Sequence, residues 1–167
     1  MTFSIQEICD RLETNEIYAR YVHAADEKDF GSLDRVFLPH TMFDWTACGG
    51  GKMTYEEAKQ GPVFTGKLFP WSFHIYANPL IEFSGDRMAA TVKVKAINPS
   101  GLHDDRDEPM MFQTQGTYID TLEKTVLGWR ITNRVWKESF IVGPLKKVDG
   151  ILWHVERCRK TSPRLNL

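Results

Sequence analysis

The sequence predicts an α+β fold in which N-terminal helices close one side of a curved antiparallel sheet. Its N-terminal part carries apolar residues at helical spacing, whereas residues 71–128 alternate in the manner of strands. Two pairs of these strand-like segments are joined by short turns that contain glycine, which is typical of antiparallel hairpins. Helices first and hairpins second is the order of an α+β domain, and a curved sheet closed by helices encloses a pocket.

The longest predicted helix covers residues 5–27, where apolar side chains recur at helical spacing. Ser4 and Glu7 have the spacing of a capping box at its start. Its apolar stripe begins with Ile5, Ile8, Cys9 and Leu12 and continues, slightly shifted, through Ile17, Tyr21 and Val22.

Two shorter helices are expected next. Residues 30–37 repeat apolar side chains at helical spacing and Pro39 follows as a stop, so residues 38–40 are predicted to form a turn. Thr54 opens a third helix, with Glu57 as the partner in its capping box.

The predicted strands begin with a short apolar one at Met42, Phe43 and Trp45, which a run of glycines closes. Residues 98–109 contain two prolines and several acids and are predicted to be a loop between two hairpins. The hairpin strands are expected at residues 75–83 with 88–97 and at residues 111–122 with 129–142.

The 167 residues are expected to form one main domain, residues 1–145. The basic tail, residues 146–167, is expected to pack on this domain or on a neighbouring subunit. A net charge of −1 gives no electrostatic reason to expect nucleic acid, and no segment approaches the length of a membrane span. Three widely spaced cysteines fit a reducing compartment, so a cytoplasmic location is expected.

Asp26 is the first candidate for chemistry, because the apolar stripe of the long helix runs into it. Tyr18, Val22 and Asp26 follow one another at four-residue spacing. A carboxylate on an apolar face needs a partner. The alternative is that Asp26 ends the helix within a polar run, residues 26–29, and points to water.

Four segments resemble the SnoaL-like branch of the nuclear-transport-factor-two-like superfamily. They read YARYVHAADEKDF (18–30), HIYANPLIEF (74–83), GTY (116–118) and GWRI (128–131), and the resemblance covers most of residues 5–142. It implies a cone-shaped, cystatin-like sheet with the pocket inside. Scytalone dehydratase, hexachlorocyclohexane dehydrochlorinase and the bile-acid dehydratase of this superfamily pair a helix-borne Asp with a His on the first long strand. Asp26 and His74 match those positions.

An Asp–His pair is chemically suited to proton abstraction. The carboxylate accepts the imidazole Nδ1–H, fixes the tautomer and leaves Nε2 as a base. On spacing alone, His74 is better explained as a core histidine bonded to a backbone carbonyl than as a catalytic residue. The resemblance favours catalysis.

The resemblance places two further catalytic candidates beside the pair. Tyr21 stands where the bile-acid dehydratase has a functional tyrosine, and its phenol could protonate a leaving hydroxyl. Arg134 matches an arginine that supports the leaving anion in the dehydrochlorinase. Both have structural alternatives, since Tyr21 could simply pack and Arg134 could pair with Asp26 or an exposed acid.

Departures from the family pattern and aromatic residues bear on the substrate. The dehydrochlorinase has a lysine at the position of Tyr21, and scytalone dehydratase has a tyrosine at the position of Ala25 and a second catalytic histidine. Both specific reactions are therefore in question. The residues expected to line the pocket are Phe43, Trp45, Trp71, Tyr76, Phe112 and Tyr118, which suit a flat apolar substrate.

The resemblance implies a cofactor-free lyase of the dehydratase or dehydrohalogenase type, acting on a small apolar, aromatic or polycyclic substrate. The alternatives are a ketosteroid-isomerase-like isomerase or cyclase, in which Asp26 takes the proton, and a non-catalytic protein that binds an apolar ligand or assembles with a partner. No metal site is expected, because the acids near His103 fit a solvated loop. The expected partners are a small substrate and other copies of the chain, as a dimer or trimer.

Overall fold

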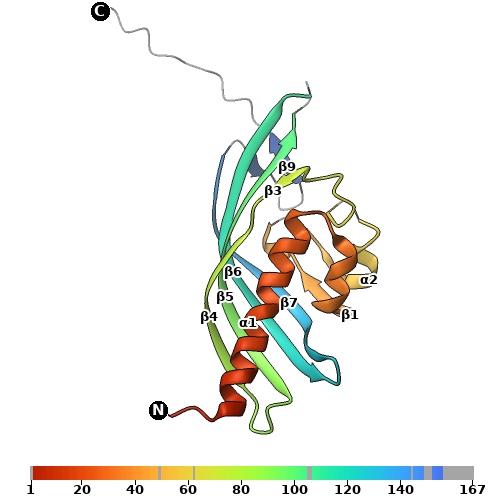
Figure 1. Ribbon diagram of the computed structural model, residues 1–167. Helices are drawn as coiled ribbons and strands as arrows, with labels where there is room; N and C mark the ends of the chain where they lie inside the picture. Colours follow the sequence, from red (N-terminus) through yellow and green to blue (C-terminus); the bar gives the residue numbers. More distant parts are fainter. Residues whose placement is uncertain are drawn as a thin grey trace, which may run out of the picture.

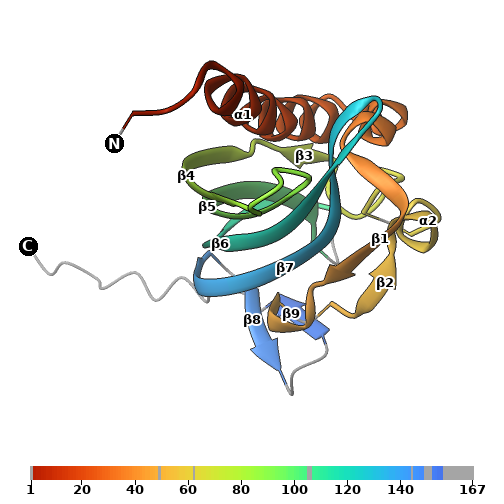
Figure 2. The ribbon, with the colours of Figure 1, turned by 90° about the horizontal axis from the view of Figure 1, so that it is seen from below.

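A strongly bent sheet of seven strands wraps around helix α1 (Ile5–Asp26) in the computed structural model (Figures 1 and 2). The structure describes residues 2–48, 50–61, 63–104, 107–143, 145–148 and 152–155, the last two ranges by their backbone alone. The strand order is β2-β1-β7-β6-β5-β3, and β4 also pairs with β5. The strands are β1 (Phe37–Asp44), β2 (Lys52–Thr54), β3 (Trp71–Ser72), β4 (Ile75–Phe83), β5 (Ala89–His103), β6 (Pro109–Thr125) and β7 (Gly128–Val142).

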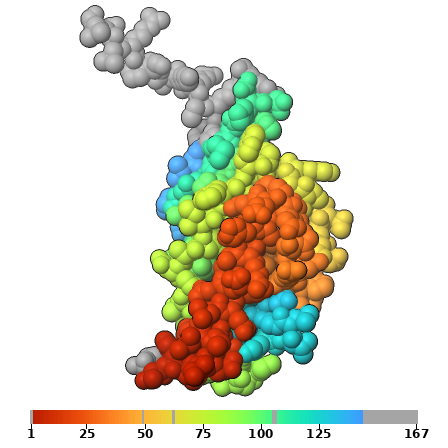
Figure 3. Space-filling view, in the orientation of Figure 1, coloured from red at the N-terminus to blue at the C-terminus, as the bar shows by residue number. Residues whose placement is uncertain are grey.

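Helix α1 lies across the concave face of this sheet, and its N-terminal half passes beside the end of the β6–β7 hairpin (Figure 3). The hydroxyl oxygen of Ser4 accepts the Glu7 N–H, as the capping pattern predicts. The buried side of the N-terminal half differs from the expected one, because it carries Asp10 and Thr14 whereas Ile5 is 82% exposed. Ile8 and Leu12 are exposed as well. Asp10 is held by Lys124 at 2.5 Å, so an ion pair replaces apolar burial there.

Both predicted hairpins are present, and their strands are longer than expected. The predicted loop 98–109 is wrong over most of its length, because β5 continues to His103 and β6 starts at Pro109. Residues 98–100 stay in register with residues 112–114 of β6. The ladder continues through Pro99 because this proline faces the gap between β3 and β4, where a missing N–H costs least.

The fold class is α+β as predicted, with a sheet that is mixed rather than wholly antiparallel. Strand β1 runs parallel to β7, with Phe43 paired to Arg134. Residues 38–40 lie in β1 and do not form the predicted turn. The register of β1 against β7 shifts between Phe37 and Met42, and this irregularity accommodates Pro39 inside a strand.

The short helices lie at the C-terminal end of α1 and beside β1. Residues Phe30–Arg35 form the 3-10 helix η1, shorter than the predicted helix, and Thr46–Cys48 form η2. Helix α2 (Tyr55–Ala58) has the predicted capping box between Thr54 and Glu57. Beyond the main sheet, β8 (Leu145–Val148) and β9 (Leu152–Val155) pair with each other. The packing expected of the tail's Trp153 and Val155 side chains, and the expectations for residues 156–167, lie outside the described residues.

The core fills the space between α1, β1 and the inner face of β5, β6 and β7. Its largest fully buried side chains are Trp129, Arg134, Tyr55, Phe37, Phe43, Leu33, Leu122 and Ile131. Arg134 is the charged member of this set, and it is enclosed together with the buried Asp120. Among the described residues, no helix combines the length and the apolarity that crossing a membrane requires.

Candidate active site

A cavity of about 490 Å³ lies between the C-terminal end of α1 and the inner face of the sheet. It is about three times the volume of a cavity that holds one benzene ring, so it has room for a molecule of two or three fused rings. Its lining is mostly apolar, with a few polar groups, which is typical of a small-molecule site. The lining includes Tyr21, Ala25, Lys28, Trp45, Phe64, Phe69, Ser72, His74, Asn98, Ser100, Phe112, Thr114, Tyr118 and Trp136.

Asp26 and His74 meet at one wall of this cavity. The distance between Asp26 Oδ1 and His74 Nδ1 is 2.6 Å, and the backbone N–H of His74 donates to Asp26 Oδ2 at 2.7 Å. The hydrogen-bonding distance expected from the sequence is therefore present. Both side chains are largely enclosed, with 19% of Asp26 and 15% of His74 exposed.

The sheet edge explains why the backbone N–H of His74 is free to bind Asp26. The preceding residue, Phe73, donates its N–H to Pro99 of β5. Because polar backbone groups alternate sides along a strand, those of His74 face away from β5 and toward α1. Asp26, the last residue of α1, takes this N–H and the ring nitrogen together.

The two hydrogen bonds also set the charge of the carboxyl group. Burial alone raises the pKa of Asp26, but the hydrogen bonds from the His74 ring and backbone outweigh it and hold the pKa below its usual value. Asp26 is therefore ionised at neutral pH and accepts a hydrogen bond from the Nδ1–H group of His74. This arrangement leaves Nε2 as the ring nitrogen available to a molecule in the cavity.

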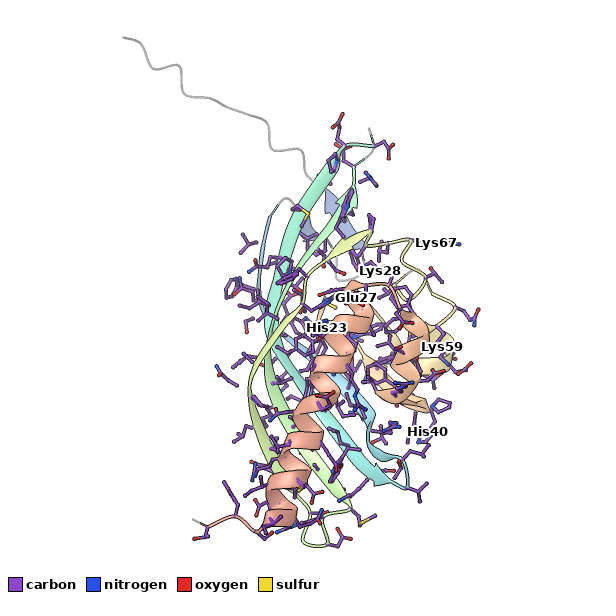
Figure 4. The ribbon with its side chains drawn as sticks, in the orientation of Figure 1. His23, Glu27, Lys28, His40, Lys59 and Lys67 are labelled. Atoms are coloured by element: carbon purple, nitrogen blue, oxygen red, sulfur yellow. The ribbon has the colours of Figure 1, made fainter. Side chains whose placement is uncertain are left out.

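Lys28 is a lining residue that the sequence did not single out. It follows the end of α1 with a positive φ of 61°, and its Nζ lies 2.6 Å from the Ser72 hydroxyl oxygen. Figure 4 shows it at the C-terminal end of α1, next to Glu27. Burial lowers the pKa of Lys28, and the charge of Asp26 partly opposes this. A positive charge is thus held close to the Asp26–His74 pair.

Three of the six predicted pocket residues line the cavity, and so does the catalytic candidate Tyr21. The ring of Tyr21 lies edge-on to His74 with 6.0 Å between centroids, and Tyr118 borders the same space. Trp45, which lies between β1 and η2, and Phe112 on β6 line it as well. The expected aromatic wall is therefore real at these positions.

Four other predicted site residues do not line this cavity. Phe43 is fully buried behind the stacked ring of Trp45, 4.7 Å away. Trp71 is 41% exposed and packs against His103. Tyr76 borders a smaller pocket of about 330 Å³ between α1 and β4. Trp71 points away because strand alternation sends it to the face opposite that of Ser72, which lines the cavity, whereas Phe43 and Tyr76 face inward and pack in or against the core.

Arg134, the fourth, is in the core behind the cavity wall. It is 1% exposed and paired with the buried Asp120, with 2.8 Å between Nη2 and Oδ2 and 3.0 Å between Nε and Oδ1. Its guanidinium lies 4.4 Å from the centre of the Tyr21 ring and 4.5 Å from that of Tyr118. The alternative of a pair with Asp26 or an exposed acid is thus wrong, and Arg134 does not line the cavity.

The sequence interpretation also missed a polar group of lining residues, namely Ser72, Asn98, Ser100, Thr114 and Trp136. Most of them lie where a loop was expected or on the strand across from it. A signal was available in the sequence, because Val92, Val94 and Ala96 alternate with Lys93 and Lys95, and the same two-residue period places residues 98 and 100 on the inner face. Within the described ranges, no cluster of three or more His, Cys, Asp or Glu side chains could hold a metal ion.

The chain matches the SnoaL-like domain model over residues 6–135. An uncharacterized protein of Mycobacterium tuberculosis is 34% identical over 137 residues, which cover 82% of this chain and 90% of that protein. This relative carries no assigned activity. The model match covers well over half of the chain.

Solved structures share the fold at low identity. A candidate scytalone dehydratase from Novosphingobium aromaticivorans is 16% identical with a TM-score of 0.71, over 89% of this chain and 97% of that one. A hexachlorocyclohexane dehydrochlorinase from Novosphingobium barchaimii is 12% identical with a TM-score of 0.66, over 81% and 90%. A nuclear transport factor 2-like protein from Salmonella enterica is 21% identical with a TM-score of 0.64, over 85% and 96%. The fold is that of the nuclear transport factor 2-like protein, and the chain belongs to the SnoaL-like family.

Proposed function

We propose that the protein is a cofactor-free lyase, of the dehydratase or dehydrohalogenase type, that acts on a small aromatic or polycyclic substrate. The observation that carries the proposal is the double hydrogen bond from His74 to Asp26 at the cavity wall. It fixes the orientation and tautomer of an imidazole whose second nitrogen is left for a substrate. The apolar lining fits a largely apolar ligand.

In the proposed reaction, His74 Nε2 takes a proton from a carbon atom of the substrate. The electrons of that C–H bond form a double bond to the neighbouring carbon, and the leaving group departs from it with its own bonding pair. The imidazolium formed on His74 is stabilised by the ionised Asp26. A departing hydroxide takes a proton from Tyr21 or Lys28, both of which line the cavity, whereas a halide needs only the positive charge of Lys28.

The role first expected of Arg134 changes in this proposal. Its guanidinium stacks near Tyr21 and Tyr118 and does not reach the cavity. Arg134 is therefore a positioning residue, which holds these two rings against the inner face of the sheet.

The isomerase alternative, in which Asp26 is the base, has less support. Both carboxylate oxygens of Asp26 are occupied by His74, and Asp26 does not itself line the cavity. The alternative of a non-catalytic binding protein rests on the apolar cavity alone. Turnover decides between these possibilities.

The test is a screen of hydroxylated and halogenated ring compounds for elimination, followed by variants. His74→Ala is expected to lower turnover by roughly 10²–10⁴-fold, and Asp26→Asn by a similar factor, because each removes the oriented base. His23→Ala is the matched control, since this exposed histidine pairs only loosely with Glu27 at 3.6 Å. Full activity of His74→Ala would refute His74 as the base, and equal losses in His23→Ala would refute the site.

We propose a homo-oligomer, a dimer or trimer, because the outer face of the sheet carries a cluster of exposed apolar side chains. Phe73, Ile75, Ile97, Phe140 and Val142 are all more than one-third exposed there. Such a cluster on one face is typical of a subunit contact. A cytoplasmic location is part of the same proposal, and the free thiol of Cys9 is in keeping with it.

A further inference from the structure

We propose that Asn98 and Trp136 form an oxygen-binding site beside His74, and that the cavity selects ring compounds carrying a hydroxyl group. The inference deepens the proposed function and rests on the same cavity. Both residues line it, and each presents a buried polar atom that has no hydrogen-bond partner in the described part of the chain. These atoms are Asn98 Oδ1, an acceptor, and Trp136 Nε1, a donor.

The strand register places Asn98 directly opposite His74. Ser72 pairs with Ser100 and Ile75 pairs with Ile97, so the residues between them bring His74 level with Asn98. Side chains opposite each other on the same face have Cβ atoms roughly 5 Å apart. A ligand atom bound by Asn98 is therefore within reach of the proposed base.

Asn98 is a buried polar residue whose side chain contacts the neighbouring strand. It is 6% exposed, and its Nδ2 faces the Thr114 hydroxyl oxygen of the neighbouring strand at 3.5 Å. This contact occupies the donor end of the amide and leaves the acceptor end open. A buried acceptor without a partner is costly, and because Asn98 lines the cavity, a hydrogen-bond donor on a bound ligand would offset that cost.

Trp136 reaches the same region from β7, because Gly116 leaves room for its ring. A Cβ atom on Gly116 would lie 2.7 Å from two ring carbons of Trp136, so the indole packs flat against the backbone of β6. The Trp136 side chain is 3% exposed, and its ring is 4.7 Å from that of Tyr118. Gly116 is opposite Ala96 on β5, one inward position from Asn98.

A hydroxyl group on a ligand combines the donor and the acceptor that these two atoms require. Its oxygen accepts the Trp136 indole N–H, and its hydrogen is donated to Asn98 Oδ1. A hydrocarbon of the same shape leaves both atoms buried and unpaired, so a site of this kind rejects it. The hydroxyl would remain on the substrate and fix the ring in the plane from which His74 removes a proton.

The experiment compares 2-naphthol with naphthalene by isothermal titration calorimetry on the full chain. The wild type is expected to bind 2-naphthol at least fivefold more tightly than naphthalene. Trp136→Phe and Asn98→Leu should each weaken 2-naphthol binding about fivefold and change naphthalene binding less than twofold, because each removes one hydrogen bond. Phe112→Leu is the matched control, since it alters the apolar wall and should weaken both ligands alike.

A second readout needs no variant. In a spectrum of ¹⁵N-tryptophan-labelled protein, one indole N–H signal should move downfield with 2-naphthol and stay in place with naphthalene. Equal affinities for the two ligands, or an unchanged preference in both variants, would overturn the proposal. His74→Ala should keep the preference for 2-naphthol, so that failure of the proposed base and failure of the oxygen site give different results.

Discussion

Replacing Asp120 by Asn should cost about 3–5 kcal/mol of unfolding free energy, because it leaves the charge of Arg134 buried and unpaired. Both side chains are almost fully enclosed, at 0% and 1% exposed, so water cannot take over the lost contacts. The pair is made through two nitrogens of the guanidinium and both oxygens of the carboxylate. With a urea m-value of about 2 kcal/mol/M, the unfolding midpoint should fall by roughly 2 M.

The control is the double replacement of Asp120→Leu with Arg134→Met. Removing both charges leaves an apolar contact of similar volume, so this variant should be more stable than Asp120→Asn. A loss below about 1 kcal/mol in Asp120→Asn, or a double variant less stable than the single one, would refute the reasoning. Urea unfolding followed by tryptophan fluorescence measures all three proteins.

Three further predictions follow from single positions. Gly116→Ala should destabilise the chain by about 1–3 kcal/mol, because its Cβ would lie 2.3 Å from a carbonyl oxygen of β7. Gly85→Ala, with open space around it, should be nearly neutral, and the urea midpoints of the two variants test this difference. The stabilising contribution of Asp26 is present above pH 3.8 and is lost as the pH falls through the lowered pKa of the folded state. Asp26→Asn should therefore flatten the pH dependence of the unfolding free energy below pH 4, and parallel curves for the wild type and the variant would contradict this. Phe140→Lys or Ile97→Lys should reduce the oligomer to monomer in light scattering, and an unchanged mass would exclude this face as the contact.

The sequence predicted the elements whose pattern is local. The long helix ends within one residue of the expected place, and both hairpins form around their expected turns. Strand β1 was shortened in the prediction because Pro39 normally ends an element, yet a register shift against β7 absorbs it. The position of that shift depends on a strand about ninety residues away and leaves no local signal.

The sequence predicted those site residues that match a family position or whose side of a helix or strand follows from the apolar pattern around them. Asp26 and His74 are in contact as expected. Phe43 does face inward, but the ring of Trp45 stacks on it, and the sequence does not show which of two neighbouring inward rings borders the cavity. Asn98 was missed because a polar residue next to a proline is typical of a loop.

The parallel pairing of β1 with β7 determines when the site can form during synthesis. The hydroxyl of Thr41 on β1 donates to the Ile131 carbonyl, a contact across 90 residues, whereas Asp26 and His74 are separated by 48. Contacts of large sequence separation form late, because the intervening chain must be ordered first. The base and its carboxylate can therefore be brought together while the wall that carries Trp45 is still unanchored. A nascent chain that has not yet released β7 from the ribosome would hold the proposed chemical groups without an enclosed cavity around them.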